Sequence, residues 1–139
     1  MRVFLDTNVI LDTIVPGRPC EVASKTVVNL GTTTPIRFSV SALSIANVAY
    51  TARKMYSKNG IRKMVDNLRY TWRVLELSDF QIYSALKSDC PDFEDAMQIA
   101  CAEDDSDVIV TNNVKHFKGY TALEVLTPQE FLDKISRCS

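Results

Sequence analysis

The chain has 139 residues, of which 46% are hydrophobic and 24% charged, so its composition is ordinary for a globular protein that buries a core. The net charge of −1 excludes a general electrostatic attraction to nucleic acid. No apolar stretch is long enough to span a membrane, and Asp6 interrupts the only apolar run near the start, so we expect no signal peptide. We predict a single domain over residues 1–139.

The four cysteines are scattered along the chain, with no Cys-x-x-Cys or Cys–His spacing that would indicate zinc. This usage is typical of a reducing compartment, and we expect a cytoplasmic protein. They are Cys20, Cys90, Cys101 and Cys138.

The first half of the chain alternates short apolar runs with longer amphipathic stretches. Val3 to Leu5 reads as a buried strand, and Thr7 or Asn8 is expected to cap the helix that follows. Asn59-Gly60 is expected to end a long helix, because Gly readily adopts the positive φ of a helix stop. The predicted elements are helices at 9–14, 21–30 and 41–56 and strands at 3–5 and 36–40.

The second half continues the alternation. Thr127-Pro128-Gln129-Glu130 is a capping box with Pro at the first helical position, so it begins the last helix. The predicted elements are helices at 61–70 and 79–87, a helix that starts near Asp92, strands at 73–77, 108–111 and 124–126, and a loop through Gly119. The alternation predicts an α/β fold with a central, mostly parallel sheet of four to five strands flanked by helices.

Charge is distributed unevenly. From Arg53 to Arg73 the charged residues are basic except for Asp66, whereas from Glu76 to Asp107 they are acidic except for Lys87. A basic region beside an acidic site would suit a bound polyanion, and the alternative is that these are solvated helix faces.

Two predicted strands end in polar residues. Asp6, followed by Asn8, comes directly after the first strand, and Thr111 and Asn113 follow the strand at 108–111. Sites in α/β proteins are built at such strand ends. Asp6 is therefore either a capping residue or a metal ligand.

Asp92 and Asp95 begin the next acidic helix. Asp92 is a good N-cap, which is its structural explanation. Asp95 shares a helical face with Ile99 and Ala102, which are expected to be buried, whereas Glu94 is expected to point away. Carboxylates over an apolar face cost desolvation free energy unless a partner compensates, and a hard cation is such a partner.

Two further polar residues have open interpretations. Asn47 lies in the otherwise apolar stretch from Ile45 to Tyr50 and is either a hydrogen-bonded core amide or a neutral oxygen aimed at the site. His116, the only histidine, lies in an expected loop and is either solvated or able to transfer a proton.

Together these segments resemble the PIN domain, the metal-dependent ribonuclease family that includes the toxins of bacterial VapBC-type toxin–antitoxin pairs. The resemblance covers nearly the whole chain and rests on the order and spacing of four segments. They are Phe4 to Asp12, Val40 to Asn47, Asp92 to Ala96 with Ile109 to Phe117, and Leu126 to Leu132.

The resemblance implies an endoribonuclease in which Asp6, Asp92 and Asp95 bind Mg²⁺ or Mn²⁺ and activate water for attack on an RNA phosphodiester. Asn8, Asn47, Thr111, Asn113 and His116 would line the site. RNA, an antitoxin protein and a second copy of the chain in a homodimer are the implied partners.

Two positions depart from the family pattern and leave a second function open. The family normally carries Glu where this chain has Asn47, and often Asp where it has Asn113 or His116. Because both changes remove negative charge, the alternative is a catalytically degenerate PIN-like module that binds RNA or a protein. A phosphatase of the haloacid dehalogenase type is disfavoured, because Asn8 stands where that chemistry expects a second Asp.

Overall fold

The computed structural model describes residues 1–138, and within them it contains a five-stranded sheet and eight helices. The strands are β1 (Arg2–Leu5), β2 (Arg37–Ser41), β3 (Arg73–Leu75), β4 (Val108–Val110) and β5 (Glu124–Leu126). The helices are α1 (Thr7–Ile14), α2 (Glu21–Thr33), α3 (Ala42–Ala52), α4 (Lys58–Thr71), α5 (Asp79–Leu86), α6 (Phe93–Asp105), α7 (Val114–Phe117) and α8 (Pro128–Cys138).

The strands pair in the order β3-β2-β1-β4-β5, and every pair is parallel. The predicted α/β class and parallel sheet are confirmed. After β1 the chain adds β2 and then β3 on one side, and it later returns to add β4 and β5 on the other. The carboxyl ends of β1 and β4 therefore flank the topological switch point, where open α/β sheets place their ligands.

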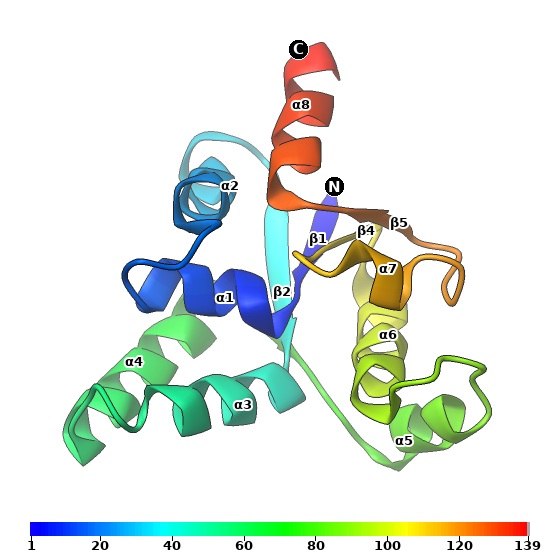
Figure 1. Cartoon of the computed structure of the whole chain (residues 1–139), viewed down its shortest axis with the longest axis horizontal. Helices are drawn as coiled ribbons and strands as arrows, with labels where there is room; N and C mark the ends of the chain where they lie inside the picture. Colours follow the sequence, from blue (N-terminus) through cyan, green and yellow to red (C-terminus); the bar gives the residue numbers. More distant parts are fainter. Residues whose placement is uncertain (139) are drawn as a thin grey trace.

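Successive residues of the central strand face opposite layers, as the two-residue period of a strand requires. Val3 and Leu5 belong to the core packed by α1, α2, α4 and α8, whereas Phe4 belongs to the core packed by α5, α6 and α7. Figure 1 shows α1 to α4 gathered on one side of the sheet and α5 to α7 on the other. All three of these strand residues are fully buried, which explains why β1 is a continuous apolar run.

The start of the first helix differs from the sequence prediction, whereas the start of the last helix agrees with it. The first helix begins at Thr7, and its N-cap is Asp6 rather than Thr7 or Asn8. The backbone N–H of Thr7 donates to Asp6 Oδ1 over 2.8 Å, because the carboxylate already lies at the strand end. The capping box of α8 is confirmed, since Thr127 Oγ1 accepts from the Glu130 N–H at 3.1 Å and the Thr127 N–H donates to the Glu130 carboxylate at 2.9 Å.

The prediction that Asn59-Gly60 ends a helix was wrong. α3 ends at Ala52, and both residues lie in the first turn of α4. Ser57 caps that turn by accepting from the Gly60 N–H at 3.0 Å, so the glycine is held in helical geometry by a cap. The loop expected before Gly119 also contains a short helix, α7.

None of the helices in residues 1–138 combines the length and the apolar character that crossing a bilayer requires. All four cysteines are free thiols.

Candidate functional site

Asp6 lies at the centre of the carboxyl edge of the sheet. Its N–H donates to the carbonyl of Val110 at 3.0 Å, so the residue continues the β1–β4 ladder by one step before α1 begins. Its side chain is only 7% exposed. The fold therefore holds a carboxylate at the switch point, largely out of contact with water.

Three hydrogen bonds fix the Asp6 carboxylate. Besides the bond from the Thr7 N–H, Oδ2 accepts from Thr111 Oγ1 at 2.7 Å and from Asn8 Nδ2 at 3.1 Å. Burial raises the pKa of Asp6 despite these bonds, which favour the charged form. The carboxylate is thus oriented by its neighbours, and a bound cation would offset its desolvation.

Asp95 approaches the same edge from the first turn of α6. Its pKa is raised to about 6, first by burial and then by the negative charges of Asp92 and Asp6. Asp92 itself is exposed and caps α6, with its Oδ1 accepting from the Asp95 N–H at 2.9 Å. Repulsion among these carboxylates is the main electrostatic feature of the site.

His116 is the nearest cationic group to Asp95. Its Nδ1 lies 3.4 Å from Asp95 Oδ2, and the protonated imidazole partly counters the rise in the pKa of Asp95. Asp92, Asp95 and His116 line a cavity of about 270 Å³ together with Lys115 and Tyr120. Substrate-sized space therefore lies directly beside the acidic residues.

Asn47 and Glu94 form a pair at the edge of the site. Asn47 Nδ2 donates to Glu94 Oε1 at 2.9 Å, and the charge of Glu94 contributes to raising the pKa of Asp6. Sequence reasoning ranked Glu94 as the carboxylate least expected to point inward, and its side chain is exposed while it contacts Asn47 of α3 beside the site. Gln98, one turn further along the same face, is buried.

A buried polar network lies behind Asp6 and was missed in the sequence. Gln98 is 1% exposed; its Oε1 accepts from Ser41 Oγ at 2.6 Å, and its Nε2 donates to Ser44 Oγ at 2.9 Å and to Thr7 Oγ1 at 3.1 Å. This network joins α1, α3 and α6 by hydrogen bonds at the carboxyl edge. It holds the helices that carry Asp6 and Asp95 in register.

The segment after β4 contacts the site through the Thr111 side chain and through backbone N–H groups. The Asn112 N–H donates to Asn8 Oδ1 at 3.1 Å, and the Asn113 N–H donates to Thr111 Oγ1 at 3.0 Å. Asn113 precedes α7 without capping it through its side chain. Thus Asn8 and Thr111 contact the acidic centre directly, whereas Asn113 supports Thr111.

The charges of Asp6 and Asp95 interact at this edge, with Asp92 at the rim. Across residues 1–138, no three His, Cys, Asp or Glu side chains converge as a ready-made metal site. The donors at the edge are oxygens of carboxylates, amides and a hydroxyl, which are the ligands of hard divalent cations such as Mg²⁺. Mg²⁺ sites commonly use one or two carboxylates and take other ligands from water and phosphate, so the residues fit such an ion.

The family model for the PIN domain matches residues 2–115, which is most of the chain. The chain belongs to the PIN domain family. We call the carboxyl edge of the sheet, with Asp6, Asp92 and Asp95, the acidic edge. The match contains all three of these residues and extends past Asn113. No curated protein sequence matches the chain.

Solved structures with the same fold include several toxin–antitoxin proteins. A toxin–antitoxin complex from Klebsiella pneumoniae is 21% identical with a TM-score of 0.67, covering 91% of this chain and 97% of that chain. DNA-bound VapBC from Salmonella typhimurium is 18% identical with a TM-score of 0.68, covering 92% and 98%. Mycobacterium tuberculosis VapC20, a toxin that cleaves the sarcin–ricin loop, is 14% identical with a TM-score of 0.65, covering 88% and 98%. At these identities the likeness shows the PIN fold.

Proposed function

We propose that this PIN-domain protein is a metal-dependent endoribonuclease that hydrolyses RNA phosphodiester bonds at the acidic edge. The observation that supports the proposal is the electrostatic repulsion between the carboxylates of Asp6 and Asp95. Two desolvated carboxylates from different elements repel one another at the switch point of the sheet, which costs stability unless a cation binds there. Strongly perturbed carboxylates in a cleft are typical of functional sites.

Asp6 and Asp95 would hold a Mg²⁺ or Mn²⁺ ion, with Asp92 as a third carboxylate at the rim. When bound, such an ion supplies a nucleophilic water and neutralises charge on the phosphate. Thr111 and Asn8 keep the Asp6 carboxylate in one orientation through the two bonds to Oδ2. His116 stands beside Asp95, where an exposed imidazole is able to give a proton to a leaving oxygen.

We also infer an antitoxin partner, because the structural neighbours include toxin–antitoxin complexes. A homodimer and a cytoplasmic location belong to the same proposal.

The first experiment is a Mn²⁺ titration by calorimetry of the wild type, Asp6→Asn and Asp95→Asn, with and without a non-cleavable RNA. We expect saturable binding in the wild type, stronger with RNA, and a loss of at least about tenfold in both variants, since each removes a charged ligand. Asp66→Asn is the matched control, because Asp66 is exposed and pairs only with Arg69 in α4. Equal Mn²⁺ binding in all four proteins would overturn the metal site.

Cleavage of a labelled RNA is measured next on the same four proteins. The proposal expects cleavage by the wild type and Asp66→Asn alone, and cleavage that chelation of the metal abolishes. Cleavage that survives in Asp6→Asn would reveal a contaminating nuclease or a different site.

A second candidate function is a module that binds RNA or protein without cleaving, and the Asn47–Glu94 pair favours it. Asn47 supplies no negative charge, and its amide occupies an oxygen of Glu94 that would otherwise be open to an ion. Asn47→Glu restores a carboxylate at this position. If the protein is a binding module, Asn47→Glu creates or raises cleavage from a negligible wild-type rate; cleavage by the wild type excludes this reading.

A further inference from the structure

A second cavity lies at the opposite, amino edge of the sheet. It has a volume of about 460 Å³ and lies where β1, β2 and β3 begin, between the ends of α2 and α4. This volume falls within the range of small-molecule sites. No residue of this cavity belongs to the acidic edge, so it has no part in the proposed nuclease chemistry.

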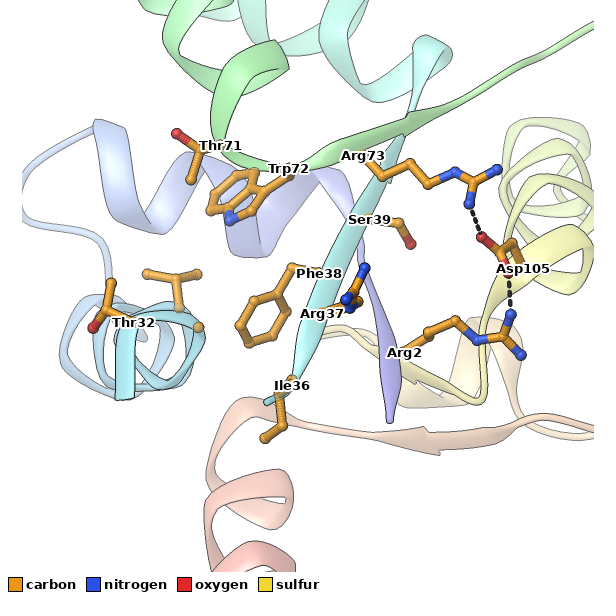
Figure 2. Close-up of a pocket in the computed structure, with 12 residues that line it drawn as sticks. Arg2, Thr32, Ile36, Arg37, Phe38, Ser39, Thr71, Trp72, Arg73 and Asp105 are labelled. Atoms are coloured by element: carbon orange, nitrogen blue, oxygen red, sulfur yellow. Dashed lines mark hydrogen bonds and ion pairs between the residues drawn. The ribbon is translucent and has the colours of Figure 1, made fainter. Parts of the chain in front are cut away.

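The cavity has a cationic half and an aromatic half. Arg2, Arg37 and Arg73 start three neighbouring strands; Arg2 lies opposite Arg37, and Arg73 lies opposite Ser39, two residues further along β2. Figure 2 shows the rings of Trp72 and Phe38 on one side of the cavity, the guanidinium groups of Arg2 and Arg73 on the other, and Arg37 between them.

Two of the three arginines are paired. Arg2 and Arg73 both bind the carboxylate of Asp105 at the end of α6, the latter at 2.5 Å. These pairs tie the starts of β1 and β3 to the end of α6, so they have a structural explanation.

Arg37 has no such explanation. Among the contacts of residues 1–138, its guanidinium has no hydrogen-bond or ion-pair partner. Arg37 lies opposite Arg2 in the sheet register. The nearby carboxylates of Asp105 and Asp107 pair with Arg2 or Arg73 and not with Arg37. Arg37 is exposed, so its guanidinium is open to an anion, and guanidinium groups bind phosphate with two parallel hydrogen bonds.

Trp72 forms the aromatic half of the cavity together with Phe38. Trp72 is partly exposed in the cavity, beside the buried Phe38, so part of its ring surface is open to a ligand. Aromatic side chains beside cationic residues bind nucleotides, because the base stacks on the ring while the phosphate meets the cation.

We propose that this amino-edge cavity binds a nucleotide, with the base on Trp72 and the phosphate on Arg37. The nucleotide is either a free mononucleotide or one unit of an RNA strand. The site acts independently of the acidic edge, since it lies at the other end of the strands.

The chain carries its own reporter for this proposal, because Trp72 is its only tryptophan. The experiment is a titration of the full chain with adenosine monophosphate in the presence of EDTA, in which tryptophan fluorescence reports binding. EDTA removes metal-dependent binding at the acidic edge. An absence of nucleotide binding in the amino-edge cavity is therefore distinguishable from an absence of metal binding or RNA cleavage at the acidic edge. We expect saturable quenching, with adenosine and inorganic phosphate each binding at least about tenfold more weakly.

Arg37→Gln is expected to weaken adenosine monophosphate binding about tenfold through the loss of a charge-assisted hydrogen bond. Arg137→Gln, at an exposed arginine on α8 outside the cavity, is the matched control and should bind as the wild type does. Thermal unfolding of both variants establishes that they fold equally well. Equal affinity in Arg37→Gln and wild type would overturn the assignment of Arg37.

A comparison of the mononucleotide with one oligonucleotide distinguishes the sources of the nucleotide. Tighter binding of an oligoadenylate that lacks a terminal phosphate indicates a unit within an RNA strand. Binding of the mononucleotide but not of this oligonucleotide indicates a free nucleotide. The absence of saturable quenching by any of these ligands at millimolar concentration would refute the site.

Discussion

Asp95 illustrates how one residue links function to stability. Its raised pKa of about 6 arises because burial and neighbouring carboxylates penalise the charged form in the folded protein. In the unfolded chain the group ionises near its usual pKa of 3.8. The folded protein therefore loses stability as the pH rises from the unfolded pKa to the folded pKa, and the loss is complete above it.

We accordingly expect Asp95→Asn to stabilise the metal-free protein at neutral pH while it abolishes metal binding. The gain should be about 2 kcal/mol above pH 7, or about 5 °C in Tm, and should vanish near pH 4, where the wild-type carboxyl is protonated. Thermal unfolding from pH 4 to pH 8 with EDTA measures it. Asp66→Asn serves as control and should show no such pH-dependent difference; a destabilised Asp95→Asn at pH 7 would contradict this account of the site.

Sequence reasoning identified residues that carry a local signal, and it missed contacts that depend on how elements pack together. Asp6 was found because it interrupts an apolar run, which is a local signal. Glu94 was assigned to the outside because helical spacing shows which residues share a face but not which neighbour that face meets. Asn47 shows the same limit, because both of its interpretations were compatible with the sequence until Glu94 was found against it at 2.9 Å.

At the scale of elements, a buried carboxylate joins α1, α2 and the segment after β4. Asp12 is 1% exposed; its Oδ2 accepts from Ser24 Oγ at 2.6 Å and Asn112 Nδ2 at 2.8 Å, while its Oδ1 accepts from Arg18 Nε at 2.8 Å. These partners come from α2, from the loop that precedes it and from the segment after β4. The same Asn112 supports Asn8 beside the acidic edge.

Asp12→Ala should therefore destabilise the protein by about 3 kcal/mol, because it leaves a guanidinium, a hydroxyl and an amide without their shared acceptor. Denaturant unfolding followed by circular dichroism measures the change. Asp66→Ala removes an exposed carboxylate with a surface ion pair and should cost less than about 1 kcal/mol. If both variants lose the same stability, the network does not join these elements.

Element boundaries were predicted well where a local rule decides them and poorly where packing does. β5 was placed correctly, and the capping box placed the start of α8. Asn59-Gly60 has a composition typical of a helix end, yet the cap from Ser57 makes it a helix start. The short α7 was overlooked because four residues give no measurable periodicity.

At the scale of the whole molecule, a net charge of −1 conceals a division between acidic and basic regions. The acidic edge gathers the carboxylates of Asp6, Asp92 and Asp95, whereas the exposed face of α4 carries three basic residues without a carboxylate partner in the described chain. These are Lys58, Arg62 and Lys63. Such a face is able to hold phosphates of an RNA whose scissile bond lies elsewhere.

We expect RNA affinity to fall with salt, with a slope of about −2 in log–log form if three phosphates contact this face. Arg62→Gln combined with Lys63→Gln should reduce the slope by about 1.4. Fluorescence anisotropy with a labelled RNA in EDTA, from 50 to 300 mM salt, provides the measurement. A slope that is flat, or unchanged in the double variant, would remove α4 from RNA binding.

The central position of β1 determines when the acidic edge can exist during synthesis. β1 is the first strand to leave the ribosome, yet one of its two neighbours is β4, and Asp6 receives its bond from Thr111 across 105 positions of sequence. At about 5 to 20 residues per second, several seconds pass before that partner is made. The nascent chain therefore cannot assemble the site until translation has passed Thr111, so the chemistry of the site is delayed relative to the synthesis of β1.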